Sequence, residues 1–151
     1  MNKYVIASFL EKVPPGIVFS KTEWPLHMTI LRPFFSAGEG SQLIEILQNS
    51  LEGKQTISLF GKTKEMFGPN RDVEVTELGH TTEIQNLHES IKDALKPHIC
   101  FESEQYPHYR PHVTNRGDRE VAIEEEIIVG SVSLVKMEND SRRVLATIKL
   151  V

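Results

Sequence analysis

Apolar and polar residues alternate along several short stretches of the chain, and this period of two predicts half-buried β-strands. Other stretches are apolar and β-branched runs bounded by glycine or proline, which also predict strands. The expected extended segments are residues 1–10, 16–20, 26–31, 56–60, 72–78, 99–102, 112–114, 126–137 and 144–151. Turn-forming residues occupy 67–70 and 138–141, so we expect the last two strands to form a hairpin.

Two segments repeat their apolar residues every three or four positions, the period of an amphipathic helix. The first carries Leu43, Ile44, Ile46, Leu47 and Leu51. We expect Ser41 to cap its start, and Gly53 lies beyond its end. The second carries Ile84, Leu87, His88, Ile91 and Leu95. Thr81 or Thr82 is its expected cap, and Pro97 follows its end.

The two halves of the chain share a loose plan. Each contains a His-x-Thr triplet in an extended segment, one expected helix and further strands. The triplets begin at His27 and His112, which are 85 residues apart. No linker or low-complexity tract divides the chain. We therefore expect a single domain over residues 1–151, with a sheet-dominated α+β fold and two helices.

The composition is that of an ordinary globular domain. Of 151 residues, 39% are apolar and 25% are charged, no apolar run approaches the length of a membrane-spanning helix, and the first run is too short for a secretory leader. A chain of this length can bury roughly two-thirds of its unfolded surface without a partner. Cys100 is the only cysteine, which excludes an intrachain disulfide and a thiolate zinc cluster. We expect a cytoplasmic monomer.

The net charge of −4 argues against a protein that coats nucleic acid nonspecifically, since such binding requires an excess of lysine and arginine. A pocket that holds one phosphate needs only local positive charge. An RNA end or a small nucleotide therefore stays compatible with the charge, whereas a long RNA footprint is disfavoured.

The two triplets carry the candidate chemistry. Side chains alternate across a strand, so His27 and Thr29 project from the face opposite Met28. His112 and Thr114 share a face in the same way. Two such strands facing one cleft would supply two titratable groups and two hydroxyls. This set suits a phosphodiester, because a base must activate the attacking hydroxyl, an acid must protonate the leaving oxygen, and donors must hold the non-bridging oxygens.

The context of the triplets is more specific than the triplets themselves. Chance gives about 0.4 His-x-Thr triplets in such a chain, and both triplets here follow a proline, Pro25 or Pro111, within two residues. Segments 25–31 (PLHMTIL) and 109–114 (YRPHVT) resemble the paired signatures of the two-histidine (2H) phosphoesterase superfamily. That superfamily includes the bacterial 2′–5′ RNA ligase and RNA 2′,3′-cyclic phosphodiesterase proteins.

The resemblance implies a bilobal, duplicated strand-helix-strand fold whose antiparallel sheets face a central cleft, and catalysis without a metal or other cofactor. It makes His27 and His112 the catalytic pair and lets Thr29 and Thr114 hold phosphate oxygens. By the same analogy His27 donates the proton and His112 accepts one, with roles that reverse with the bond broken and the reaction direction. The implied substrate is a 2′,3′-cyclic phosphate or 2′–5′ linkage of an RNA end or nucleotide.

Residues around the second triplet extend the candidate site. Tyr109 and Arg110 are candidates for contacting phosphate or base, although residues beside a proline can also simply shape the approach to the strand. The segment 115–119 (NRGDR) departs from the apolar continuation usual in the family. It predicts either an early end of the strand or basic groups at the rim of the cleft.

Two other functions stay open. One is a noncatalytic module that binds an RNA end or nucleotide in the same cleft. The other is a metal-dependent hydrolase, but Pro107 and Pro111 forbid the helix on which His108 and His112 would share a zinc ion. No role is assigned to the remaining histidines, His80, His88 and His98.

Overall fold

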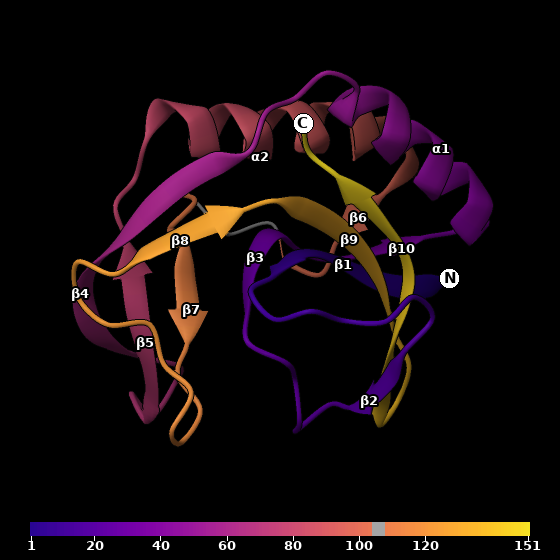
Figure 1. The fold of residues 1–151 in the computed structure, drawn as a ribbon. Coiled ribbons are helices and arrows are strands. Elements are labelled where there is room, and N and C mark those ends of the chain that lie inside the picture. Colours follow the sequence, from indigo (N-terminus) through magenta and orange to yellow (C-terminus); the bar gives the residue numbers. More distant parts are fainter. Residues whose placement is uncertain (104–107) are drawn as a thin grey trace.

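The computed structural model describes residues 1–103 and 108–151, so Pro107 lies outside the described residues. Within them the chain forms a mostly antiparallel, curled sheet and two α-helices (Figure 1). The strands are β1 (Asn2–Phe9), β2 (Val18–Ser20), β3 (His27–Ser36), β4 (Ile57–Phe67), β5 (Val73–Leu78), β6 (Cys100–Phe101), β7 (His112–Thr114), β8 (Glu126–Val129), β9 (Ser131–Met137) and β10 (Ser141–Lys149).

The sheet has two lobes that meet between β3 and β7. Its strand order is β2-β10-β9-β1-β3-β7-β5-β4-β8, with β6 added beside β3. The first five strands of this order form one lobe, and the last four form the other (Figure 1). Met28 of β3 pairs with Val113 of β7, and this pair joins the lobes. The expected α+β, two-lobed fold is confirmed.

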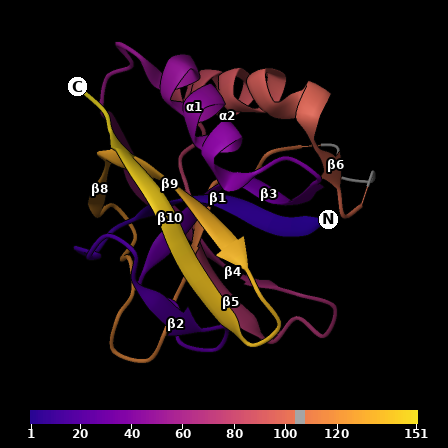
Figure 2. The ribbon, with the colours of Figure 1, turned by 90° about the vertical axis from the view of Figure 1, so that its right-hand side faces the viewer.

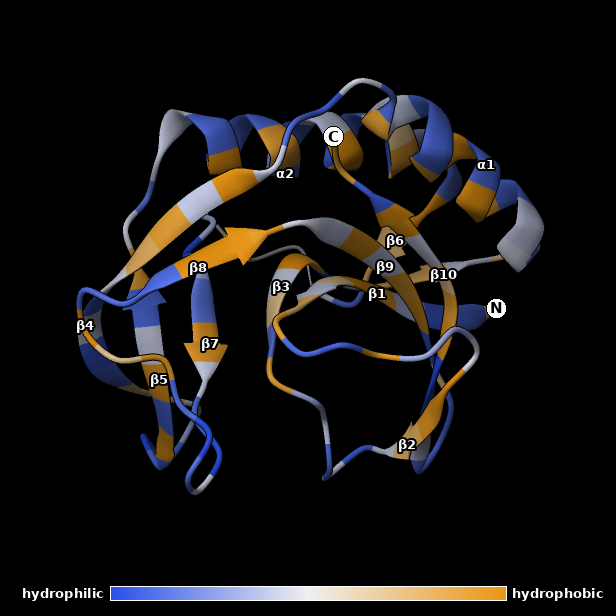
Figure 3. Cartoon of the chain, viewed as in Figure 1, coloured by the Kyte–Doolittle hydropathy of each residue, from blue (hydrophilic) through white to orange (hydrophobic). Residues whose placement is uncertain are grey.

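The helices α1 (Gly40–Leu51) and α2 (Thr82–Leu95) pack together and cover one side of the sheet (Figures 1 and 2). Their apolar residues turn toward the sheet (Figure 3). The Thr81 side chain accepts a hydrogen bond from the Ile84 N–H at 3.2 Å, which confirms the expected cap. The expected cap at Ser41 is wrong, because Ser41 lies inside the helix and Glu39 occupies the N-cap position without a side-chain hydrogen bond.

Strand β3 continues past the expected end at residue 31. Tyr4 pairs with Phe34 and Ile6 with Leu31, so two residues of β3, Arg32 and Pro33, lie opposite the single residue between them on β1. This is a β-bulge, and a bulge accommodates a proline that a regular ladder would exclude.

Other strand boundaries also differ from the expectation. The strand expected at 56–60 runs on to Phe67, where the predicted turn begins. The strand expected at 126–137 is interrupted at Gly130, and its two pieces, β8 and β9, belong to different lobes. The expected final hairpin is confirmed, since β9 and β10 pair in antiparallel fashion. In the described part of the chain no helix is both long and apolar enough to cross a membrane.

Replacing Met28 with alanine should lower the free energy of unfolding by about 2–5 kcal/mol, because it opens a cavity where the two lobes join. Met66→Ala is the matched control, since that side chain is 49% exposed and its loss should cost less than about 1 kcal/mol. Urea denaturation followed by circular dichroism measures both values. Equal losses would contradict a tightly packed junction between the lobes.

Candidate active site

The two His-x-Thr triplets lie side by side where the lobes meet. Met28 and Val113 face each other and are fully buried, so their neighbours along each strand project from the opposite face of the sheet. One step from this pair, the antiparallel register places His27 opposite Thr114 and Thr29 opposite His112. Residues 85 positions apart thus form one group of two imidazoles and two hydroxyls.

Both imidazoles are held in the same tautomer by the same kind of contact. His27 Nδ1 lies 2.9 Å from the Pro25 carbonyl oxygen, and His112 Nδ1 lies 2.7 Å from the Arg110 carbonyl oxygen. A carbonyl oxygen can only accept, so Nδ1–H donates in each case. When the ring is neutral, Nε2 therefore carries the lone pair and can accept a proton from a substrate.

An aromatic cluster surrounds His27. The ring of Trp24 stacks on the imidazole at a centroid distance of 4.3 Å and an interplanar angle of 28°, and Phe9 lies 6.0 Å away. Burial lowers the pKa of His27 to about 4, and the positive charges of Arg116 and His112 act in the same direction. His27 is therefore neutral at pH 7 in the unliganded protein.

His112 has an aromatic neighbour of its own. Phe67, at the end of β4, meets its imidazole edge to face at 4.8 Å. Burial lowers the pKa of His112, and the charge of Arg110 adds to this effect, whereas Glu77 and the hydrogen bond to the Arg110 carbonyl oppose it. Both candidate catalytic histidines are thus biased toward the neutral form.

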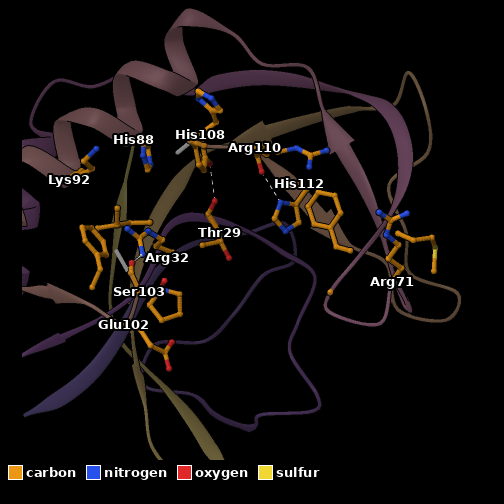
Figure 4. Close-up of a pocket in the computed structure, with 17 residues that line it drawn as sticks. Thr29, Arg32, Arg71, His88, Lys92, Glu102, Ser103, His108, Arg110 and His112 are labelled. Carbon is orange, nitrogen blue, oxygen red and sulfur yellow. Dashed lines mark hydrogen bonds between the residues drawn. The ribbon is translucent and has the colours of Figure 1, made fainter. Parts of the chain in front are cut away.

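A cavity of about 650 Å³ opens beside the triplets (Figure 4). Its lining comes from β3, α2, the β4–β5 hairpin and the segments around β6 and before β7. The described residues that line it are Thr29, Leu31, Arg32, Pro33, Met66, Phe67, Gly68, Arg71, His88, Lys92, Phe101, Glu102, Ser103, His108, Tyr109, Arg110 and His112. Thr29 and His112 therefore reach the cavity, whereas His27 and Thr114 do not line it.

Tyr109 and Arg110, both predicted to contact substrate, line this cavity and also have partners within the protein. The Tyr109 hydroxyl donates to the Thr29 carbonyl oxygen at 2.9 Å, and burial raises its pKa. Arg110 Nε lies 2.7 Å from Glu77 Oε2, and its guanidinium lies over the Phe67 ring at 4.7 Å. Tyr109 thus holds the backbone of the first triplet in place, and Arg110 provides a fixed positive charge beside the second triplet.

The segment after the second triplet connects the lobes. β7 ends at Thr114, as one reading of the basic segment 115–119 predicted. Arg116 Nη1 then donates to the Thr22 carbonyl oxygen at 3.2 Å, and Arg119 pairs with Glu11 at 2.8 Å. These contacts bind the loop after β7 to the segment before His27, and they account for the effect of Arg116 on the His27 pKa.

His88 was given no role from sequence, yet it lines the cavity. Its Nδ1–H donates to the Ile30 carbonyl oxygen at 2.7 Å, and its ring lies parallel to that of Tyr109 at 4.2 Å. The sequence signal that could have indicated a role for His88 was its position within the apolar stripe of a helix. Arg32, Lys92 and Phe101 gave no comparable signal, because only the tertiary fold brings them to the cavity.

Among the described residues, no three His, Cys, Asp or Glu side chains are grouped so that they could hold a metal ion. His108 lines the cavity without such partners.

Comparisons with known proteins point to one family. A family model described as the 2′-5′ RNA ligase superfamily matches residues 19–130, a range that includes both triplets. No curated protein sequence matches the chain.

Solved structures share the fold over almost the whole chain. A structure described as a phosphoesterase matches with a TM-score of 0.62 and 15% identity, covering 99% of this chain and 98% of its own. LigT from E. coli complexed with 3′-AMP matches with a TM-score of 0.62 and 16% identity over the same shares. TT0787 from Thermus thermophilus matches with a TM-score of 0.64 and 15% identity, covering 98% and 97%. At these identities the matches establish the fold.

Trp24 is the only tryptophan in the chain, so its fluorescence should report the protonation of His27. Imidazolium quenches indole fluorescence more strongly than neutral imidazole does. We expect quenching with a midpoint near pH 4, rather than near the ordinary histidine value, because burial disfavours the charged ring.

The control for this titration is His27→Gln, which should lack the transition. Circular dichroism over the same pH range separates quenching from acid unfolding. A midpoint near 6.5 in the folded protein would contradict the burial of His27.

Proposed function

The chain belongs to the 2′-5′ RNA ligase superfamily, and we propose that it is a metal-independent phosphoesterase that acts on a 2′,3′-cyclic phosphate or a 2′–5′ phosphodiester of an RNA end or nucleotide. The observation that carries the proposal is the pairing of the two triplets across the Met28–Val113 junction, with both imidazoles tethered through Nδ1. The binding of 3′-AMP by LigT supports a ligand of nucleotide type. One copy of residues 1–151, as a single domain and a monomer, would supply the whole site.

The proposed reaction is an in-line displacement at phosphorus. One imidazole accepts the proton of the attacking hydroxyl or water through Nε2, and the P–O bond to that oxygen forms. The bond to the leaving ribose oxygen breaks as the other imidazole donates a proton to it. The hydroxyls of Thr29 and Thr114, together with Arg110 and Tyr109 nearby, would hold the non-bridging oxygens and the substrate. Following the family analogy, His27 is the donor and His112 the acceptor for cyclic phosphate hydrolysis.

Substrate binding would favour uptake of the missing proton from solvent. Both imidazoles are biased toward the neutral form in the unliganded protein, whereas the reaction needs one of them charged. A phosphate held between them carries a negative charge, which favours imidazolium. The site would therefore become correctly protonated as the substrate enters.

A second candidate is a noncatalytic module that binds an RNA end or nucleotide. One observation favours it, because His27 and Thr114 do not line the cavity that Thr29 and His112 reach. The module would bind the same ligands without turning them over, so turnover measurements separate the two functions.

Turnover of a short RNA with a 2′,3′-cyclic phosphate, in the presence of EDTA, tests the proposed pair. We expect His27→Ala and His112→Ala each to lose at least about a hundredfold in kcat/KM, because each removes one proton transfer. His98→Ala is the matched control, since His98 is exposed and outside the cavity, and it should retain activity. Binding by the folded wild type without turnover of cyclic or 2′–5′ substrates would favour the noncatalytic module.

The pH dependence of kcat/KM provides a separate test, because it reports the protonation of the free enzyme. An imidazole is charged only below its pKa, and burial places both pKa values below 6.5. We therefore expect kcat/KM to fall as the pH rises above about 6.5, by roughly tenfold per unit. A cyclic phosphate diester does not titrate there. A flat profile from about pH 6 to about pH 8.5 would contradict catalysis by this pair.

A further inference from the structure

The cavity is more basic than the chain that forms it. Among the described residues that line it, four are cationic and one is a carboxylate, whereas the whole chain has a net charge of −4. The cations are Arg32, Arg71, Lys92 and Arg110, and the carboxylate is Glu102. Glu102 is paired with Lys3 at 2.8 Å. Arg110 is paired with Glu77 and lies beside the second triplet, so the reacting phosphodiester accounts for that cation but not for Arg32, Arg71 and Lys92.

The bulge in β3 brings Arg32 to the cavity. Arg32 and Pro33 both line the cavity because the extra residue changes the alternation of side chains after Leu31. The guanidinium carbon of Arg32 lies 4.1 Å from the ring centroid of Phe101, and the Ser103 carbonyl oxygen accepts from its Nη1. These contacts hold a planar cation at the wall of the cavity, where it is suited to an oxyanion.

Lys92 approaches the same part of the cavity from α2. It lies one turn after His88 on the same face of the helix, and both residues line the cavity. Its ion-pair partner is Glu89, at 3.7 Å, and both side chains are more than a third exposed. A pair this exposed is weak, so a phosphate can compete for the ammonium group.

These cations lie apart from the site of the reacting phosphate. In Figure 4, Arg32, His88 and Lys92 lie to one side of Thr29 and His112, and Arg71 lies to the other. We propose that Arg32 and Lys92 form a second phosphate subsite, so that the preferred substrate carries a further phosphate on its nucleoside. This inference rests on the proposed function, which provides the position of the first phosphate. The further phosphate is either a terminal 5′-phosphate or the next internal phosphodiester of an oligonucleotide.

Equilibrium binding of unreactive product-like ligands tests the subsite without requiring turnover. The ligands are adenosine 3′-phosphate, adenosine 3′,5′-bisphosphate, the dinucleotide ApAp, and ApAp with a neutral methylphosphonate in place of its internal phosphodiester. Calorimetry gives each dissociation constant. We expect at least one of the bisphosphate and ApAp to bind about tenfold more tightly than adenosine 3′-phosphate, a difference of about 1.4 kcal/mol. The ligand that binds more tightly identifies the second phosphate as a terminal 5′-phosphate or as an internal phosphodiester.

Two lysine variants assign the gain to the subsite. Lys92→Met keeps most of the side chain's apolar length while removing its charge, and it should abolish most of the gain. Lys96→Met is the matched control, because Lys96 is exposed just after α2 and does not line the cavity, and it should keep the gain. Arg32→Met, checked for folding by circular dichroism, should behave as Lys92→Met does.

Three results would overturn the subsite. The first is equal binding of all the adenosine ligands, and the second is equal loss of the gain in Lys92→Met and Lys96→Met. The third is a gain that only ApAp and its methylphosphonate analogue show. Such a gain would come from the second nucleoside rather than from the charge of the internal phosphodiester. A second-phosphate gain in a protein that turns over no cyclic or 2′–5′ substrate would retain the subsite and reject the enzymatic function.

Discussion

The pairing of Met28 with Val113 is the contact on which the candidate site depends. β3 and β7 belong to different lobes and different halves of the sequence, and this pair is where they meet. Both side chains are fully buried, so a shift of the register by one residue would move the histidines into the core and the apolar residues into the cleft. The packing of the core thus determines which four polar side chains face the ligand.

The same arrangement links the position of each imidazole to its charge. A backbone carbonyl two residues earlier holds each Nδ1–H, and an aromatic ring, Trp24 or Phe67, lies against each imidazole. These neighbours orient the rings but also withdraw them from water, which makes a positive charge unfavourable. In the unliganded site the histidines are therefore already oriented, although neither imidazole is favoured to carry a positive charge.

Local patterns were sufficient to predict both helices, most strands and the two triplets, because these features depend on residues close together in the chain. The errors in the strands arose where distant residues intervene. Pro33 stays within a strand because a bulge opposite β1 accommodates it, and the strand after residue 126 breaks at Gly130, where the chain passes between lobes. The triplets indicated the centre of the site, but its walls, which include Arg32 and His88, come from elements that only the tertiary fold brings together.

The bulge also divides β3 into two parts with different freedom to evolve. Before it, pairing with β1 and the junction with β7 fix the alternation from His27 to Thr29, and a second register shift lies between Thr29 and Leu31. After it, the extra residue absorbs changes in the wall of the cavity without altering the direction of the imidazole. Mutation could therefore change the ligands that the scaffold accepts while its acid and base groups stay in place. Such separation of selectivity from reactivity would allow one fold to diversify at low sequence identity.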